Sequence, residues 1–536
     1  MTIGVTGLRG DAAGAGVLLR FALRRERFPL LAWLCGAAAL LAMQSLSSQR
    51  FYDTPEKLAQ LRRTMGGNAA AVAMGGPERL LDTIGGEVLF EVFGYVAIVV
   101  ALMSMFMVGR HTRTDEETGR MELIRSARVG RRAPAIAALA LAGMADLIAG
   151  LAVFAVAVGT GLPVGGSILL GAAITGVGLT FAALTAVAAQ VFENPRSVYG
   201  SVALCLASAY VLRAVGDVGD GTLSWASPLG WGQRTYPYVE NRWWPLLLFV
   251  VATIALTALA FALLTHRDFG AGLLPYATGR ARATWALRSP AALAWRLQRG
   301  TLAGWVIGVF GLGAAYGSFA DSIEQYLADN PEFAAFLPGG AEDAVNSYLA
   351  LSLSMLALLV SAYSITAVLR ARAEEADGRA EPILAAPVSR YAWFGGHLGA
   401  ALIGSTLVLV AGGFGQGLTH GLMTGDAGEP ARLAAASLAY LPGVWTIAAA
   451  AAIAFGWLPK IALPVAWSVF AYCAVATLFT DSFDLPDWFD DASPFAHTPL
   501  APLEGVTATA LLILLALGAA GIAVGLTGFR RRDVGA

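Results

Sequence analysis

Residues 88–109 read VLFEVFGYVAIVVALMSMFMVG, and this stretch decides the fold class. A helix needs about 20 predominantly apolar residues to cross the hydrocarbon core of a bilayer. The stretch is long enough, and Glu91 is its single charged residue. In the 536-residue chain, 57% of the residues are hydrophobic and 14% are charged, a composition that excludes an ordinary soluble protein.

Other stretches of the same character predict an all-α polytopic membrane protein with about twelve transmembrane helices in two groups of six. Arginines precede the first apolar stretch and no small-residue cleavage site follows it, so we expect that span to be retained. The Ala/Gly-rich third and tenth spans are long enough to tilt, kink or break. The spans are expected near 28–46, 88–109, 133–160, 167–191, 198–215 and 243–265, then near 301–320, 347–369, 392–414, 431–456, 460–480 and 506–528.

The charges of the loops give an orientation, because cytoplasmic loops carry an excess of Arg and Lys. We therefore expect a multi-pass protein of the cell membrane with both termini in the cytoplasm. The predicted inner segments hold Arg110, Arg113, Arg120, Arg125, Arg128, Arg131 and Arg132, then Arg267, Arg280, Arg282, Arg288, Arg296 and Arg299, and finally Arg530, Arg531 and Arg532. The predicted outer loops hold Asp321, Glu324, Asp329, Glu332, Glu342 and Asp343, and also Asp481, Asp484, Asp487, Asp490, Asp491 and Glu504.

Polar landmarks recur at matching spacing, which indicates an internal duplication. Six spans per half is an even number, so we expect a parallel repeat with a central pathway between the halves. We predict a first half at 1–270, a cytoplasmic linker at 271–290 and a second half at 291–536. The matches are Arg24, Arg27, Leu30, Trp33 and Gly36 with Arg296, Arg299, Leu302, Trp305 and Gly308, the segment 113–131 with 372–390, Pro195-Arg196 with Pro459-Lys460, and Ser227-Pro228 with Ser493-Pro494.

Motifs of catalysis are absent from the sequence. Lys57 and Lys460 are the only lysines, and neither lies in a Gly-x-x-x-x-Gly-Lys-Ser/Thr loop that could cradle phosphates. The five histidines are scattered, and Cys35, Cys205 and Cys473 lie singly in apolar runs, where they indicate packing rather than metal or disulfide chemistry. We therefore expect no enzyme, no metal and no cofactor on this chain. A net charge of −1 gives no reason to expect a nucleic-acid partner.

The most informative feature is the duplicated segment RTDEETGRMELI (113–124) and RAEEADGRAEPILAAPVSR (372–390). It predicts a helix continuing out of a span, an acidic patch, a glycine that permits a sharp turn, and a short amphipathic helix at the membrane surface. A merely solvated, charge-balanced loop is the alternative. A loop of that kind has no need of the fixed Glu and Gly spacing that both copies keep.

The run from Glu374 to Arg390 resembles the segment after the second span in type-two ABC exporter permeases. The whole chain, with its two six-span halves, is similar to actinobacterial antibiotic exporter permeases of the tetronasin-resistance kind. The resemblance implies a coupling helix in each half that docks on separate nucleotide-binding ATPase subunits, in two copies, which hold Mg-ATP. It assigns this coupling role to Glu116, Gly119, Arg120 and Glu122, and to Glu375, Gly378, Arg379, Glu381 and Pro387.

The two copies depart from one another at two positions. Arg128 lies where the second half has Pro387, and Leu123 lies where it has Pro382. We therefore expect the two docking helices to differ in strength or geometry.

A charged side chain at the centre of a membrane helix costs on the order of 3 kcal/mol, so each such residue is a candidate for a functional role. Glu91 and Asp146 are candidates for a substrate path, and their alternative role is interhelical hydrogen bonding or a wetted position. The resemblance places the path along the second and fifth spans of each half. Aromatic residues there could form a surface for a hydrophobic compound, although any single one is more often packing: Phe90, Phe93, Tyr95, Tyr348 and Tyr363.

The leading hypothesis is a permease of an ATP-driven exporter for hydrophobic antibiotics or drugs. An ion-coupled secondary transporter is the alternative within transport, and a membrane scaffold that moves nothing is the alternative outside it. The outer loops 47–87 and 321–346 are expected to form small helices.

Overall fold

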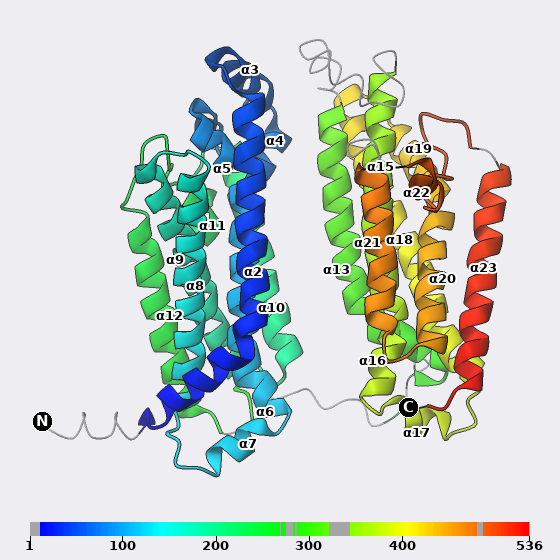
Figure 1. Cartoon of the computed structure of the whole chain (residues 1–536), viewed down its shortest axis with the longest axis horizontal. Coiled ribbons are helices and arrows are strands. Elements are labelled where there is room, and N and C mark those ends of the chain that lie inside the picture. Colours follow the sequence, from blue (N-terminus) through cyan, green and yellow to red (C-terminus); the bar gives the residue numbers. More distant parts are fainter. Residues whose placement is uncertain are drawn as a thin grey trace, which may run out of the picture. The chain divides into compact units, whose positions relative to one another are not determined.

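The computed structural model describes residues 11–268, 270–274, 282, 284, 287–320, 343–479, 486–506 and 508–534. The chain divides into two compact units, Met1–Gly279 (unit 1) and Arg280–Ala536 (unit 2), each a bundle of helices (Figure 1). In these ranges the only β-type pairing is one isolated bridge, between Phe192 and Leu274. The predicted all-α class is confirmed.

Unit 1 contains six long helices joined by short ones (Figure 1). At one end of the bundle, α3, α4 and η1 form the small helices predicted for the loop 47–87. In order, the elements are α2 (Ala15–Phe51), α3 (Pro55–Met65), α4 (Ala69–Gly75), η1 (Glu78–Asp82), α5 (Ile84–Gly109), η2 (Arg110–Thr114), α6 (Asp115–Glu117), α7 (Arg120–Arg125), α8 (Ala133–Gly159), α9 (Val164–Val191), α10 (Pro195–Val218), η3 (Leu223–Ala226), α11 (Pro228–Gln233) and α12 (Leu246–His266).

Unit 2 repeats this order of long helices. Most of the second predicted outer loop, 321–346, lies outside the described residues. The described elements are α13 (Pro290–Phe319), α15 (Ala344–Val368), α16 (Arg370–Ala376), α17 (Ala380–Leu384), α18 (Arg390–Thr424), α19 (Glu429–Ser437), η7 (Leu438–Tyr440), α20 (Leu441–Trp457), α21 (Ala462–Phe479), α22 (Asp487–Asp491) and α23 (Ala508–Arg531).

Within the described ranges, eleven helices are long and apolar enough to cross a membrane. The eleventh predicted span corresponds to α21, a shorter helix whose 18 residues rise about 27 Å at 1.5 Å per residue. The tenth span is interrupted at η7, between α19 and α20, as its composition allowed. The ninth, α18, runs about ten residues past the predicted end at 414.

The repeated landmarks of the sequence occupy matching places in the two units. Pro195 begins α10, and Pro459 lies in the turn before α21. Ser227 caps α11 by accepting a bond from the Gly230 amide at 3.3 Å, and Ser493 accepts one from the Phe495 amide at 3.3 Å. Both serines are completely buried, so each is a structural turn residue.

The most buried long helices are α5 and α9 in unit 1 and α15 and α20 in unit 2. By contrast, α2, α12, α13 and α23 bury fewer than a quarter of the residues in their most apolar stretch. A second span buried at the centre of each bundle gives a rigid base to the segment that continues from it.

Candidate coupling site

The segments that follow the second span of each half lie at one end of their bundles, and we call them the first segment (110–132) and the second segment (369–391) (Figure 1). In the first, α5 continues through the π-helical turn η2 into α6. Gly119 then turns the chain into α7 with a φ of 72°, and Gly378 turns it from α16 into α17 with a φ of 71°. This left-handed conformation favours glycine and explains the fixed spacing.

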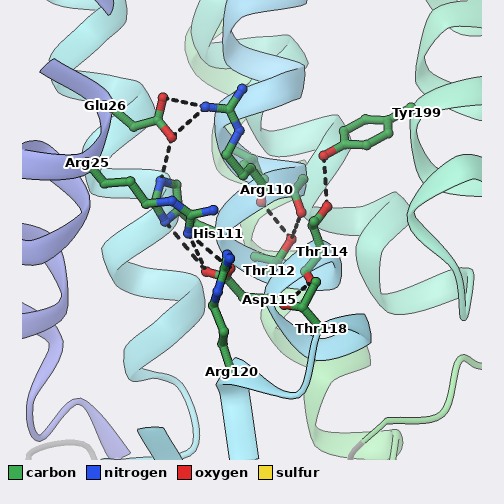
Figure 2. Close-up of polar contacts among 12 residues, drawn as sticks. Arg25, Glu26, Arg110, His111, Thr112, Thr114, Asp115, Thr118, Arg120 and Tyr199 are labelled. Atoms are coloured by element: carbon green, nitrogen blue, oxygen red, sulfur yellow. Dashed lines mark hydrogen bonds and ion pairs between the residues drawn. The ribbon is translucent and has the colours of Figure 1, made fainter. Parts of the chain in front are cut away.

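Asp115 joins the first segment to α2 (Figure 2). Its carboxylate accepts bonds from Arg25 of α2 at 3.0 and 3.2 Å and from Arg120 of α7 at 3.1 Å. The Asp115 side chain is 7% exposed. The carboxylate therefore holds the first span and the short helix α7 together across the glycine turn.

Glu26 provides a second connection between α2 and the segment, and its side chain is 1% exposed. Arg110 donates to both of its oxygens at 2.9 and 2.8 Å, and His111 Nε2 lies 3.0 Å from Oε1 (Figure 2). Desolvating a carboxylate is costly unless cations and donors surround it. Here one arginine and one histidine surround it.

Glu116 joins the first segment to the end of unit 1. Arg113, which is 1% exposed, donates to Glu116 at 2.7 Å and to the carbonyls of Ala189 and Ala271 at 2.5 and 2.8 Å. Arg267, the residue after α12, binds both Glu116 oxygens at 2.5 and 3.1 Å. Glu116 and Arg113 together thus link the second span, the fourth span and the chain that leaves the sixth.

The second segment repeats part of this arrangement with its own residues. Glu374 accepts bonds from Arg379 at 2.7 and 3.0 Å and pairs with Arg370 at 2.8 Å. The hydrogen bond to Glu374 raises the pKa of the Arg379 guanidinium, which therefore stays charged. Glu375 binds Arg532, the residue after α23, at 2.6 and 2.7 Å.

The remaining predicted coupling residues lie on the outside of these segments. Glu122 and Glu381 are exposed in α7 and α17, and Pro387 is exposed before α18. Leu123 has 76% of its surface exposed although it is apolar. Each segment therefore has one side tied to its bundle and another side open.

The sequence-based reasoning missed the partners that hold the segments. Arg25, Glu26 and His111 received no role, and Arg267 and Arg532 entered only through the charge count of their loops. Local spacing could not reveal these partners, since residues such as Glu116 and Arg267 are far apart in the sequence. Across the part of the chain that the structure describes, no group of three or more His, Cys, Asp or Glu could hold a metal ion.

Comparison with known proteins identifies the family. A model of the multidrug efflux system permease Rv1217c, C-terminal domain, matches residues 18–264 and 287–530, one stretch in each unit. The chain is also 36% identical over 521 residues to the multidrug efflux system permease protein Rv1217c of Mycobacterium tuberculosis, covering 96% of this chain and 94% of that protein. The chain belongs to the Rv1217c family of efflux permeases.

The predicted path residues of this permease differ in where they lie. Asp146 is fully buried, and its Oδ1 accepts a bond from Ser104 of α5 at 2.6 Å, which is the interhelical role. Glu91 is half-buried in α5, and Tyr95 has 51% of its surface exposed. The other aromatic residues pack inside their own units: Phe90 and Phe93 in unit 1, and Tyr348 and Tyr363 in unit 2.

Each unit of the permease has an open apolar groove beside the first and second spans. In unit 1 the groove has a volume of about 380 Å³ and includes Trp33, Gly36 and Val99. In unit 2 it has a volume of about 540 Å³ and includes Trp305 and Gly308. The tryptophan and glycine are the same repeated landmarks in both, so the duplication extends to this surface.

Proposed function

We propose that this permease is the membrane-spanning subunit of an ATP-driven ABC exporter for hydrophobic antibiotics or drugs. Two copies of a separate ATPase subunit would bind Mg-ATP and dock on the first and second segments. The absence of a phosphate-binding loop from the 536 residues supports a separate motor. The printed name of the relative, a multidrug efflux system permease, supports the substrate class.

The duplicated, ion-paired segment is the observation that carries the proposal. On its inner side, Glu116 and Glu375 are bound to arginines at the ends of the last spans. On its outer side, Glu122 and Glu381 are exposed, each three residues after its glycine turn. An element anchored on one side and open on the other can pass a partner's movement to the helices behind it. The excess of arginine at this end supports a cytoplasmic position for it.

The apolar grooves support export of a hydrophobic compound. Ligand sites for such compounds are concave and lined mainly by apolar and aromatic groups. Trp33 in unit 1 stacks on Phe106 at 6.2 Å between ring centroids, and Trp305 in unit 2 lies 5.8 Å from the Tyr363 ring. The partly buried Phe106 ring and the buried Tyr363 ring thus pack against the groove tryptophans. We place the substrate path along these faces, with Tyr95 exposed one helical turn before Val99.

The experiment is co-purification of the tagged permease with its ATPase, followed by ATP-dependent export of ethidium in inverted vesicles. Reversing the charge at the exposed carboxylates, with Glu122→Lys and Glu381→Lys, should lower export by about tenfold or more if both dock on a protein surface. Glu56→Lys, an equally exposed change in α3 at the far end of unit 1, is the matched control and should leave export unchanged.

Two outcomes contradict the proposal. Export that continues after deletion of the ATPase gene and follows an imposed ion gradient would indicate a secondary transporter. Normal ATPase binding by the double variant Glu122→Lys with Glu381→Lys would mean that the motor docks elsewhere.

A further inference from the structure

A bidentate ion pair between an arginine and a carboxylate joins the last span of each half to its segment. Arg267 follows α12 directly, and Arg532 follows α23 directly. The Arg267 and Glu116 side chains are 6% and 10% exposed, and those of Arg532 and Glu375 are 14% and 3% exposed. Both pairs are bidentate, a geometry that fixes the orientation of a helix end as well as its distance.

A second arginine also binds the same helix end. Arg131 donates to the carbonyls of Leu264 and Arg267 at 3.0 and 2.7 Å. In unit 2, Arg390 donates to the carbonyls of Arg530 and Arg532 at 2.9 and 2.5 Å. The last carbonyls of a helix have no partner within the helix, so these guanidinium groups satisfy them. We call the two contacts together the end clamp.

The surroundings of the end clamp differ between the units while its contacts persist. In unit 1, Arg113 shares the Glu116 carboxylate. In unit 2, the Arg532 guanidinium lies over the Phe455 and Phe529 rings, at 4.9 and 5.0 Å from their centroids. Desolvated ion pairs add little net stability compared with apolar packing. A clamp kept in two different environments therefore indicates a need for a fixed position.

From this repeated geometry we infer that Arg267 and Arg532 are positioning residues that make α12 and α23 move together with the segments. The inference rests on the proposed function and deepens it. A displacement of α6 or α16 by a docked motor would pull the end of the sixth or twelfth span through the carboxylate. The second span, continuous with each segment, would not be the only helix driven.

The test uses the whole complex in proteoliposomes and measures ethidium exported per ATP hydrolysed. Arg267→Lys and Arg532→Lys keep the positive charge but lose the guanidinium group that binds both carboxylate oxygens. Each should lower the ratio about tenfold, as expected when charge-assisted hydrogen bonds are lost from the coupling between two sites. Complex assembly and basal ATP hydrolysis should be unchanged, which a merely structural role would not predict. Arg79→Lys, an exposed ion-paired arginine outside the segments, is the control.

The second contact keeps the inference testable if Arg267→Lys or Arg532→Lys reduces the amount of protein. Arg131→Lys and Arg390→Lys should then show the same fall in the ratio. An unchanged ratio in assembled complexes of all four variants would overturn the inference. Failure of the wild-type complex to export with ATP would instead overturn the proposed function, so the two failures are distinguishable.

Discussion

The first and second segments share their contacts to the rest of the bundle at aligned positions. In each, a carboxylate bonds the arginine just beyond the glycine turn, and an arginine donates to a carbonyl near the end of the fourth span. Each also forms the end clamp on its last span. The aligned pairs are Asp115 with Arg120 and Glu374 with Arg379, Arg113 to Ala189 and Arg372 to Pro459, Glu116 with Arg267 and Glu375 with Arg532, and Arg131 and Arg390 on helix-end carbonyls.

The segments differ in how they contact the first span of their half. In unit 1, Arg25 and Glu26 of α2 form ion pairs with the first segment. At the matching positions α13 has Leu297 and Gln298. Gln298 is 5% exposed, and neither atom of its amide finds a hydrogen-bond partner among the described residues. Among the described residues, both segments contact the last span of their half, whereas only the first segment forms ion pairs with its first span.

The largest expected effect concerns the buried arginine of each segment. Arg113→Met should destabilise the protein by about 3 kcal/mol, because buried carbonyls and a shared carboxylate lose their donor. Arg372→Met should cost about 1 kcal/mol, since the half-buried Arg372 makes one such bond, to Pro459. Thermal unfolding of the purified variants in detergent measures the difference. Equal losses would mean that the two segments are fixed with equal strength.

A smaller effect is expected at Glu26. Glu26→Gln makes the first segment resemble the second and should cost about 2 kcal/mol, because Arg110 and His111 lose a charged acceptor. The same unfolding measurement, with Glu56→Gln as an exposed control, tests it. A Glu26→Gln protein as stable as wild type would show that the ionic contact to α2 adds nothing.

The glycine turns should behave alike. Gly119→Ala and Gly378→Ala should each cost about 1 kcal/mol, because alanine is strained at a positive φ. A Cβ would meet no atom at either site, so backbone strain alone sets the cost. If one alanine variant is clearly less stable than the other, the two turns are not equivalent and the comparison must be revised.

The smallest effect is expected at Gln298. Gln298→Leu should be neutral or stabilise the protein by up to about 1 kcal/mol, since an unpaired buried amide is replaced by an apolar group of similar size. Its matched change in unit 1, Glu26→Leu, should destabilise. A clear loss of stability in Gln298→Leu would reveal a partner for the amide.

The spans could be predicted from the sequence because each depends on a local run of apolar residues. The exception at α18 has a local cause. The predicted span ended inside a glycine-rich stretch, but a Cβ on Gly313 of α13 would lie 2.1 Å from the Gly412 carbonyl oxygen, so the glycines permit close helix packing. The helix therefore continues, and Gln416 inside it donates to Ser352 at 2.7 Å.

The two segments were found from their repeated spacing, which shows what the residues share but not what they contact. Glu116 and Glu375 were singled out, while Arg267 and Arg532 were not, because no pattern within one segment indicates a partner at the end of another helix. Glu26 was missed for the same reason. A single acidic residue among the arginines before the first apolar stretch has an ordinary appearance until the fold brings Arg110 beside it.

The chain just beyond α12 has a consequence for dividing the permease into two polypeptides. Ala271 offers its carbonyl to Arg113, and the amides of Leu273 and Leu274 donate to Gln190 and Val191 at 3.1 and 2.9 Å. The first half is therefore complete only when these residues stay with it. A gene split after Gly279 keeps Arg113 and Arg267, the two arginines bound to Glu116, on one polypeptide, whereas a split after His266 moves Arg267 to the other.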